Sequence, residues 1–138
     1  MTSSMSSSSS SSIPYAYAKE ICNQVLQLDK AIRFAGIANN MGTLVAYKLR
    51  EGLVPLLNEE ELQNSIMKTV LRMKTREDYE PKLGDVIYSF ALYKRVKRAT
   101  IPLDGHPYLA VLAVSFDMAA DHDSIIMDKI LPVLKQGK

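Results

Sequence analysis

Apolar residues recur at helical spacing in three segments of the chain. Residues three or four positions apart lie on one face of a helix, so this spacing predicts amphipathic helices with one buried stripe. The first helix is expected to begin near Ser12 and to end near Lys30, the second covers residues 58–79, and the third begins near Ser124. Pro132 lies inside the third pattern and should kink or shorten that helix, because proline has no backbone N–H to donate.

The second helix has a clear start and a wide apolar stripe. Asn58 precedes it and Glu61 follows three positions later, which is the spacing of a capping box. Periodicity does not tell whether the stripe faces the chain's own sheet or a second copy of the helix. The members of the stripe are Leu62, Ile66, Met67, Val70, Leu71 and Met73.

Five other segments have the composition of β-strands. An Asn-Asn-Met-Gly run ending at Gly42 joins the first two as a hairpin, and Asp104-Gly105 marks the turn between the last two. The last strand is nearly all apolar, which is typical of a central strand covered on both faces. Gly36 in mid-strand indicates a bulge or the close approach of a packed helix. The predicted strands are residues 32–38, 43–49, 86–94, 96–103 and 108–116.

The order of these elements is helix, two strands, helix, three strands, helix. Five antiparallel strands with flanking helices form an α/β sandwich of the α+β class. A chain of 138 residues, with 47% hydrophobic and 23% charged residues, has the size and composition of one globular domain. Residues 1–12 are almost all serine and are predicted to be disordered, so the single domain is expected to comprise residues 13–138.

The single cysteine, Cys22, excludes an internal disulfide. It lies on the apolar stripe of the first helix, so we interpret it as a small buried hydrophobe. One unpaired cysteine fits a reducing cytoplasm, where we expect the protein to reside. No apolar run reaches the roughly 18 residues of a membrane span, and serine occupies the place of a secretory signal's apolar region.

Motifs for catalysis do not appear in the sequence. None of the six glycines forms a phosphate-binding loop, and no Gly-x-Ser-x-Gly occurs. Asp117, Asp121, His122 and Asp123 are residue types that bind divalent ions, but they lack the spacing of a known metal motif. A solvated loop with an Asp at a helix N-cap explains them better. We therefore expect no catalytic residue, no metal, no cofactor and no enzymatic activity.

Four cations lie within five positions, at Lys94, Arg95, Lys97 and Arg98. Side chains alternate along a strand, so the four share one side of the molecule only if the chain reverses near Lys94. A solvated turn that discourages edge-to-edge aggregation is one interpretation. A docking patch for an acidic protein, nucleic acid or anionic lipid is the other. The net charge of only +2 does not favour a dedicated nucleic-acid binder.

Four stretches of the sequence resemble the roadblock/dynein light-chain superfamily, a relative of the profilin-like and longin folds, and also small archaeal proteins of the same architecture. The resemblance covers residues 15–136, whereas the serine-rich tail and the basic cluster are not hallmarks of this family. The four stretches are "EICNQVLQLDKAIRFAGIANNMGTLVA" (20–46), "LREG" (49–52), "EPKLGDVIYS" (80–89) and "ATIPLDGHPYLAVLAV" (99–114).

The resemblance implies a non-enzymatic interaction module, because none of these motifs is catalytic. Members of this family commonly form homodimers through the central helix and the third strand, and they bind small GTPases or larger cytoplasmic scaffolds. The interface residues expected here are Leu62, Ile66, Met67, Val70 and Met73 of the helix with Val86 and Tyr88 of the strand. The basic residues 94–98 are the candidate docking site. A nucleic-acid-associated protein and a small-ligand sensor are the alternative hypotheses.

Overall fold

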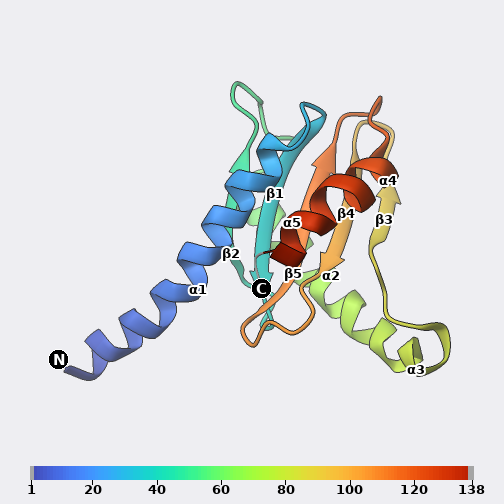
Figure 1. The fold of residues 1–138 in the computed structure, drawn as a ribbon. Coiled ribbons are helices and arrows are strands. Elements are labelled where there is room, and N and C mark those ends of the chain that lie inside the picture. Colours follow the sequence, from blue (N-terminus) through green and yellow to red (C-terminus); the bar gives the residue numbers. More distant parts are fainter. Residues whose placement is uncertain (1, 137–138) are drawn as a thin grey trace.

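The computed structural model describes the backbone of residues 2–136 and the side chains of residues 14–136. The order of elements is the predicted one, and the fold is an α+β sandwich (Figure 1). The strands are β1 (Ile32–Asn39), β2 (Leu44–Leu49), β3 (Ser89–Leu92), β4 (Lys97–Pro102) and β5 (Leu109–Phe116). The helices are α1 (Thr2–Gln27), α2 (Glu59–Arg76), α3 (Glu80–Leu83), α4 (His122–Ser124) and α5 (Leu131–Gln136), with a 3-10 turn at Glu77–Tyr79 and a π-helical segment at Ile125–Ile130.

The five strands form one antiparallel sheet in the order β2-β1-β5-β4-β3. β5 lies in the middle and pairs with β1 on one side and β4 on the other. Leu112 and Val114 of β5 are 0% and 2% exposed on one face of the sheet, and Val111 and Ala113 are 2% and 6% exposed on the other, so the prediction of a central, doubly covered strand is confirmed. The sheet ends at β3, whose outer edge pairs with no strand of the described chain.

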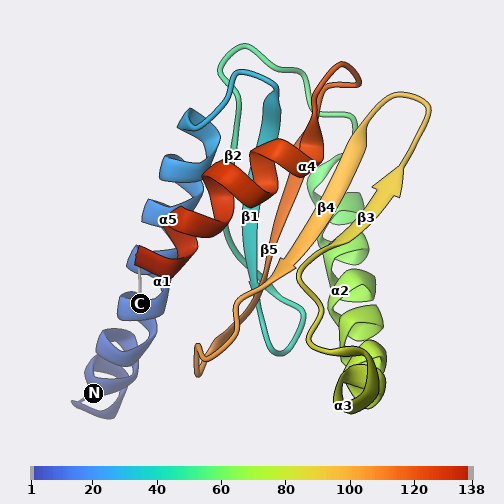
Figure 2. The same cartoon turned by 45° about the vertical axis from the view of Figure 1, so that its right-hand side comes forward.

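Helices cover the two faces of the sheet (Figure 2). α1 lies on one face together with the C-terminal helix, which consists of α4, the π-helical segment and α5. On this face Val25, Leu112 and Ile126 belong to a large buried cluster. α2 lies on the other face, where Ile66 and Val70 pack on β1 and β5 in a smaller buried cluster. The predicted capping box fixes the start of α2, because Glu61 N–H donates to Asn58 Oδ1 at 2.8 Å and Asn58 N–H donates to Glu61 Oε1 at 3.0 Å.

The glycines of the first hairpin behave as the sequence indicates. Gly42 has a φ of 83°, the left-handed conformation expected in the turn. The register of β1 shifts between Ile37 and Ala38, next to Gly36. A Cβ at Gly36 would lie 2.6 Å from the Phe34 ring and 3.2 Å from a Leu44 methyl group. The close approach therefore comes from side chains of the same sheet and not from a packed helix.

α1 begins at Thr2, well before the predicted start near Ser12. In Figure 1 its first turns extend past the sheet, and its second half lies on the sheet face. Serine is a moderate helix former at best, so the propensity of this segment adds little to the helix. The division of the chain into a disordered segment, residues 1–12, and a domain, residues 13–138, stays a prediction.

Two further elements differ in detail from their predicted form. β3 is shorter than the expected 86–94, because Val86 and Tyr88 precede the strand and Lys94 lies in the turn that follows. The C-terminal helix continues past Pro132 instead of stopping there. Its π-helical segment lets the Leu131 N–H donate to the Ile126 carbonyl immediately before the proline, so the wider turn accommodates a residue without an N–H.

Candidate functional site

The four clustered cations do not gather on one face. Lys97 and Arg98 are neighbours in β4, so their side chains leave opposite faces of the sheet. Lys97 Nζ donates to the Ala120 carbonyl at 2.7 Å, beside the C-terminal helix. Arg98 lies on the α2 face with the turn residues Lys94 and Arg95. The expectation that all four form one docking patch is wrong for Lys97, which lies on the opposite face of the sheet from Arg98.

α2 supplies two further cations to the same place. Lys68 and Arg72 are one helical turn apart, so they lie on the same side of α2. Together with Lys94, Arg95 and Arg98 they line a groove of about 790 Å³ between α2 and the β3–β4 turn. We call this feature the basic groove. The sequence places Lys68 and Arg72 only on the polar side of a helix, because their proximity to residues 94–98 arises from the tertiary fold.

The cations of the basic groove have no acidic partners among the described side chains. The ion pairs among the described residues join Arg33 and Arg50 to Asp117 and Lys129 to Asp29, and none involves a groove cation. Glu61 also lines the groove, but its carboxylate accepts the Asn58 N–H at the helix cap. The groove therefore presents a concentrated positive field to solvent.

A smaller hollow adjoins the basic groove on the same face of the sheet. It has a volume of about 320 Å³ and shares Leu56, Leu57, Val96 and Arg98 with the groove as common walls. Its other walls are largely apolar and come from β1, β2, β5 and the start of α2, including Phe34, Leu49, Leu53 and Leu62. We call it the apolar pocket. Glu59 at its rim accepts a hydrogen bond from the Tyr47 hydroxyl, with the two oxygens 2.9 Å apart, so this carboxylate also has a partner.

The expected dimer residues occupy three different environments. Ile66, Val70 and Met73 are 0%, 2% and 7% exposed in the core beneath α2, so they are not available to a second copy of the chain. Leu62, Val86 and Tyr88 are half-buried, and the Tyr88 hydroxyl donates to Asp123. Met67 is 43% exposed. The stripe therefore faces the chain's own sheet, except at its outer margin.

The outer side of α2 and the edge of the sheet carry exposed apolar side chains. Leu71 is 58% exposed and lies one turn from Met67 on α2. Leu92, at the end of the edge strand β3, is 63% exposed. The Arg76 guanidinium donates to Ser89 Oγ at 3.0 Å and ties the end of α2 to this strand. Met67 lies against Gly42 of the β1–β2 turn, so the Met67–Leu71 side of α2 does not adjoin β3. Exposed apolar side chains and an unpaired strand edge are each common in surfaces that meet another chain.

The three aspartates considered for a metal site accept hydrogen bonds from other groups of the chain. Asp121 caps the C-terminal helix by accepting the Ser124 N–H and hydroxyl, and these bonds lower the pKa of its carboxyl group. The His122 ring stacks on Phe90 with centroids 3.8 Å apart. Within the described part of the chain, no three metal-binding side chains group together. Asp117 contributes instead to a separate network of charges.

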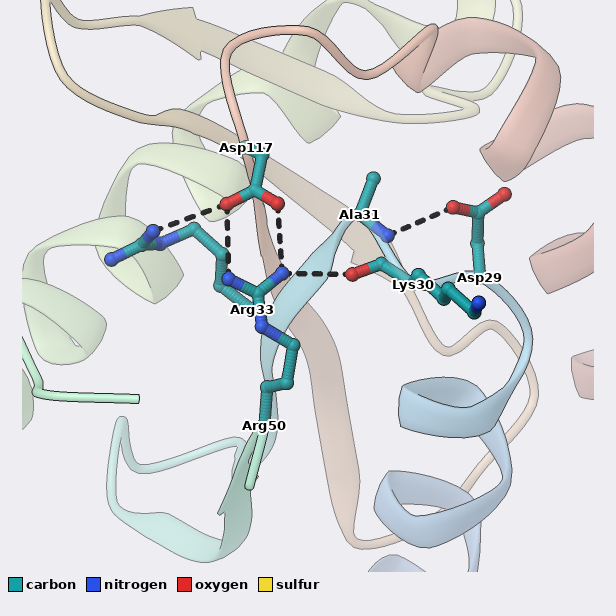
Figure 3. A network of polar contacts seen from close by, with 6 residues as sticks. All are labelled: Asp29, Lys30, Ala31, Arg33, Arg50 and Asp117. Atoms are coloured by element: carbon teal, nitrogen blue, oxygen red, sulfur yellow. Dashed lines mark hydrogen bonds and ion pairs between the residues drawn. The ribbon is translucent and has the colours of Figure 1, made fainter. Parts of the chain in front are cut away.

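Asp117 follows β5 and accepts hydrogen bonds from two arginines (Figure 3). Arg50, at the end of the first hairpin, donates from Nη1 to Oδ2 at 2.8 Å and from Nη2 to Oδ1 at 3.2 Å. Arg33 of β1 donates to Oδ1 at 3.2 Å. Arg50 also donates to the Lys30 carbonyl at 2.8 Å. The hydrogen bonds from Arg50, and then those from Arg33, hold the pKa of Asp117 below its usual value. This network joins three segments at one end of the sheet.

Cys22 has the buried environment predicted for it. Burial raises the pKa of its thiol to about 12, and the neutral thiol donates to the Ala46 carbonyl. A thiol held neutral in this way is a poor nucleophile.

A second large hollow bears on the ligand-sensor hypothesis. It has a volume of about 880 Å³ and lies between α1, the C-terminal helix and the β4–β5 loop. His106 Nδ1 accepts the N–H groups of Tyr108 and Leu109 in this loop, and burial lowers the pKa of the imidazole. The hollow carries no cluster of ion-binding or nucleophilic side chains among its described lining residues.

Comparison with known proteins gives structural but not sequence matches. No protein-family model matches the sequence, and no curated protein matches it. The gliding protein MglB from Thermus thermophilus superposes with a TM-score of 0.68 and 17% identity over 90% of this chain and 87% of that chain. A structure of MglB with a tetrameric arrangement gives 0.67 and 16%, over 90% and 89%. A Roadblock/LC7 domain from Streptomyces avermitilis gives 0.62 and 11%, over 86% and 94%.

These likenesses establish the fold. The chain has a roadblock/LC7-type fold, which the resemblance at residues 15–136 implied. Across residues 2–136, no helix combines the length and the apolar character that crossing a membrane requires.

Proposed function

We propose that the protein is a non-enzymatic roadblock-type interaction module that forms a homodimer through α2 and β3 and docks on a small GTPase or a larger cytoplasmic scaffold. The observation that carries this proposal is the edge of β3, which pairs with no described strand and ends at the exposed Leu92. A second exposed apolar surface, at Met67 and Leu71, lies on the side of α2 that faces the β1–β2 turn. The family resemblance of the sequence supports the type of partner.

The proposed interface differs from the one expected from the sequence. Ile66, Val70 and Met73 hold α2 on its own sheet, so the contact between copies uses the next side of the helix. Two edge strands that pair with each other satisfy backbone N–H and C=O groups that otherwise face water. Methionine is flexible and polarizable, which suits a surface that adapts to a twin. One of the structural neighbours is MglB in a tetrameric arrangement, which supports self-association as a property of this fold.

Sedimentation equilibrium at micromolar concentration tests the dimer. The wild-type chain should have twice the monomer mass, and Met67→Lys should shift it to the monomer because a buried lysine without a partner is costly. Met118→Lys is the matched control, since Met118 is 42% exposed, against 43% for Met67, but lies in the loop after β5. A monomeric wild-type chain, or equal loss of dimer in both variants, contradicts the proposal.

The partner is tested by affinity capture with the full chain, followed by titration of the captured small GTPase or scaffold. Met67→Lys serves as the variant and Met118→Lys again as the control. The purified protein should turn over no nucleotide by itself. Turnover that one point mutation abolishes would contradict the non-enzymatic assignment.

A further inference from the structure

The basic groove and the apolar pocket form one continuous surface with two chemical halves. Leu56, Leu57, Val96 and Arg98 line both hollows, so the two adjoin and an extended ligand can contact both. One half offers cations that pair with no described acidic group, and the other offers an apolar cavity in the range of sites that hold organic groups.

The charges of the groove select an anionic ligand. Five cations from α2 and the β3–β4 turn converge on it, and the carboxylate that lines it is held at the cap of α2. The like charges repel one another when the groove is empty. An anion that neutralises several of them relieves this repulsion and gains attraction at the same time.

The surroundings of the groove favour an acidic polypeptide over a nucleic acid. A phosphodiester backbone follows a continuous positive track. Here the track is interrupted by Glu59, Glu60 and Glu61 at the start of α2, and Glu59 borders the apolar pocket. The pocket contributes burial of apolar surface, which is the usual source of affinity at the centre of a protein interface. A partner that matches both halves has carboxylates next to a large apolar side chain.

We propose that this surface binds an acidic segment of a partner protein, with one large apolar side chain in the apolar pocket and the flanking carboxylates on the basic groove. The inference rests on the proposed function, because it specifies which part of the partner the interaction module recognises. Arg98 has a central place, since it borders both halves of the surface.

Fluorescence anisotropy with a labelled peptide of alternating Glu and Asp around a single Phe tests the proposal. The wild-type chain should bind this probe, and replacement of the Phe by Ala should weaken binding by about tenfold, the loss expected for one buried apolar group. Lys94→Gln/Arg95→Gln should weaken it by about three- to tenfold, since exposed charge pairs contribute modestly. Lys19→Gln/Lys82→Gln removes the same charge from exposed positions outside the groove and should leave binding unchanged.

Besides the absence of binding, two outcomes overturn the proposal. One is equal weakening in both double variants, which indicates attraction by net charge alone. The other is tighter binding of a labelled oligothymidylate than of the acidic peptide, which assigns the groove to nucleic acid. Sedimentation of the same samples reports the oligomeric state separately. A chain that stays dimeric but does not bind the peptide therefore contradicts this inference without contradicting the proposed function.

Discussion

The two faces of the sheet differ in how completely the chain covers them. On one face, α1 and the C-terminal helix enclose the larger buried cluster, which extends over β1, β4 and β5. On the other, α2 covers part of β1 and β5 and leaves the basic groove and the apolar pocket open beside it. Figure 2 shows both helical layers and the β3–β4 hairpin next to α2. The first face supplies most of the burial, so the second is free to recognise a partner.

The arginines and lysines of the described chain show the same division between structure and recognition. Arg33 and Arg50 share the Asp117 carboxylate and join strands. The groove cations pair with no described acidic group. Charges that stabilise a fold form ion pairs within it, whereas charges that attract a partner remain unpaired and exposed in the monomer. Substitutions on the two sides of this division should therefore affect different measurements.

The largest expected effect is on the fully covered face. Leu112→Ala should reduce the free energy of unfolding by about 2–5 kcal/mol, through lost transfer energy and the cavity that remains. Ile66→Ala on the α2 face should fall in the lower half of the same range, because a helix with open space beside it can settle into the cavity. Both side chains are 0% exposed, so the comparison isolates the surroundings. Urea denaturation measures the free energy of unfolding of both variants. A larger loss of this free energy in Ile66→Ala than in Leu112→Ala contradicts the distinction between the faces.

The next effect concerns the charge network at the end of the sheet. Asp117→Asn should cost about 1–2 kcal/mol at neutral pH, because two arginines lose their carboxylate in a partly solvated site. Since the folded state lowers the pKa of Asp117, its contribution is present above the unfolded pKa of about 4 and is lost as pH falls through the folded pKa. Asp29 shifts in the same direction. Denaturation midpoints at neutral and acid pH should therefore differ less in Asp117→Asn than in the wild type. An equal difference in both proteins contradicts this role.

The sequence was sufficient to predict the elements of the fold because each is encoded locally. The Asn58–Glu61 capping box, the left-handed Gly42 and the apolar strand around Leu112 all rest on neighbouring residues. Periodicity located the stripe of α2 correctly, but it could not assign Ile66 to the chain's own core or Met67 to the surface, because the two are adjacent in one stripe. Only the position of the sheet separates them.

The candidate site was harder to predict because it depends on contacts between distant segments. The run of cations at residues 94–98 indicated a docking patch, yet strand alternation places Lys97 and Arg98 on opposite faces of the sheet. Lys68 and Arg72 are distant in sequence and gave no sign that they would join the groove. The apolar pocket likewise needs walls from five elements, β1, β2, α2, β4 and β5. Local patterns determine such residues only as polar or apolar, and the packing of α2 on the sheet brings them together.

The smallest effect on stability is expected in the basic groove. Lys94→Gln/Arg95→Gln should change the free energy of unfolding by less than about 0.5 kcal/mol, because these exposed side chains form no ion pair with a described residue and bury no apolar core. Any change should be a gain, since the substitutions remove repulsion from Lys68, Arg72 and Arg98. That gain should shrink as salt screens the groove over about 8 Å at physiological ionic strength. Urea midpoints at low and high salt measure both effects. A loss comparable with that of Asp117→Asn would place these cations among the charges that hold the fold together, and would remove the distinction between the two sets.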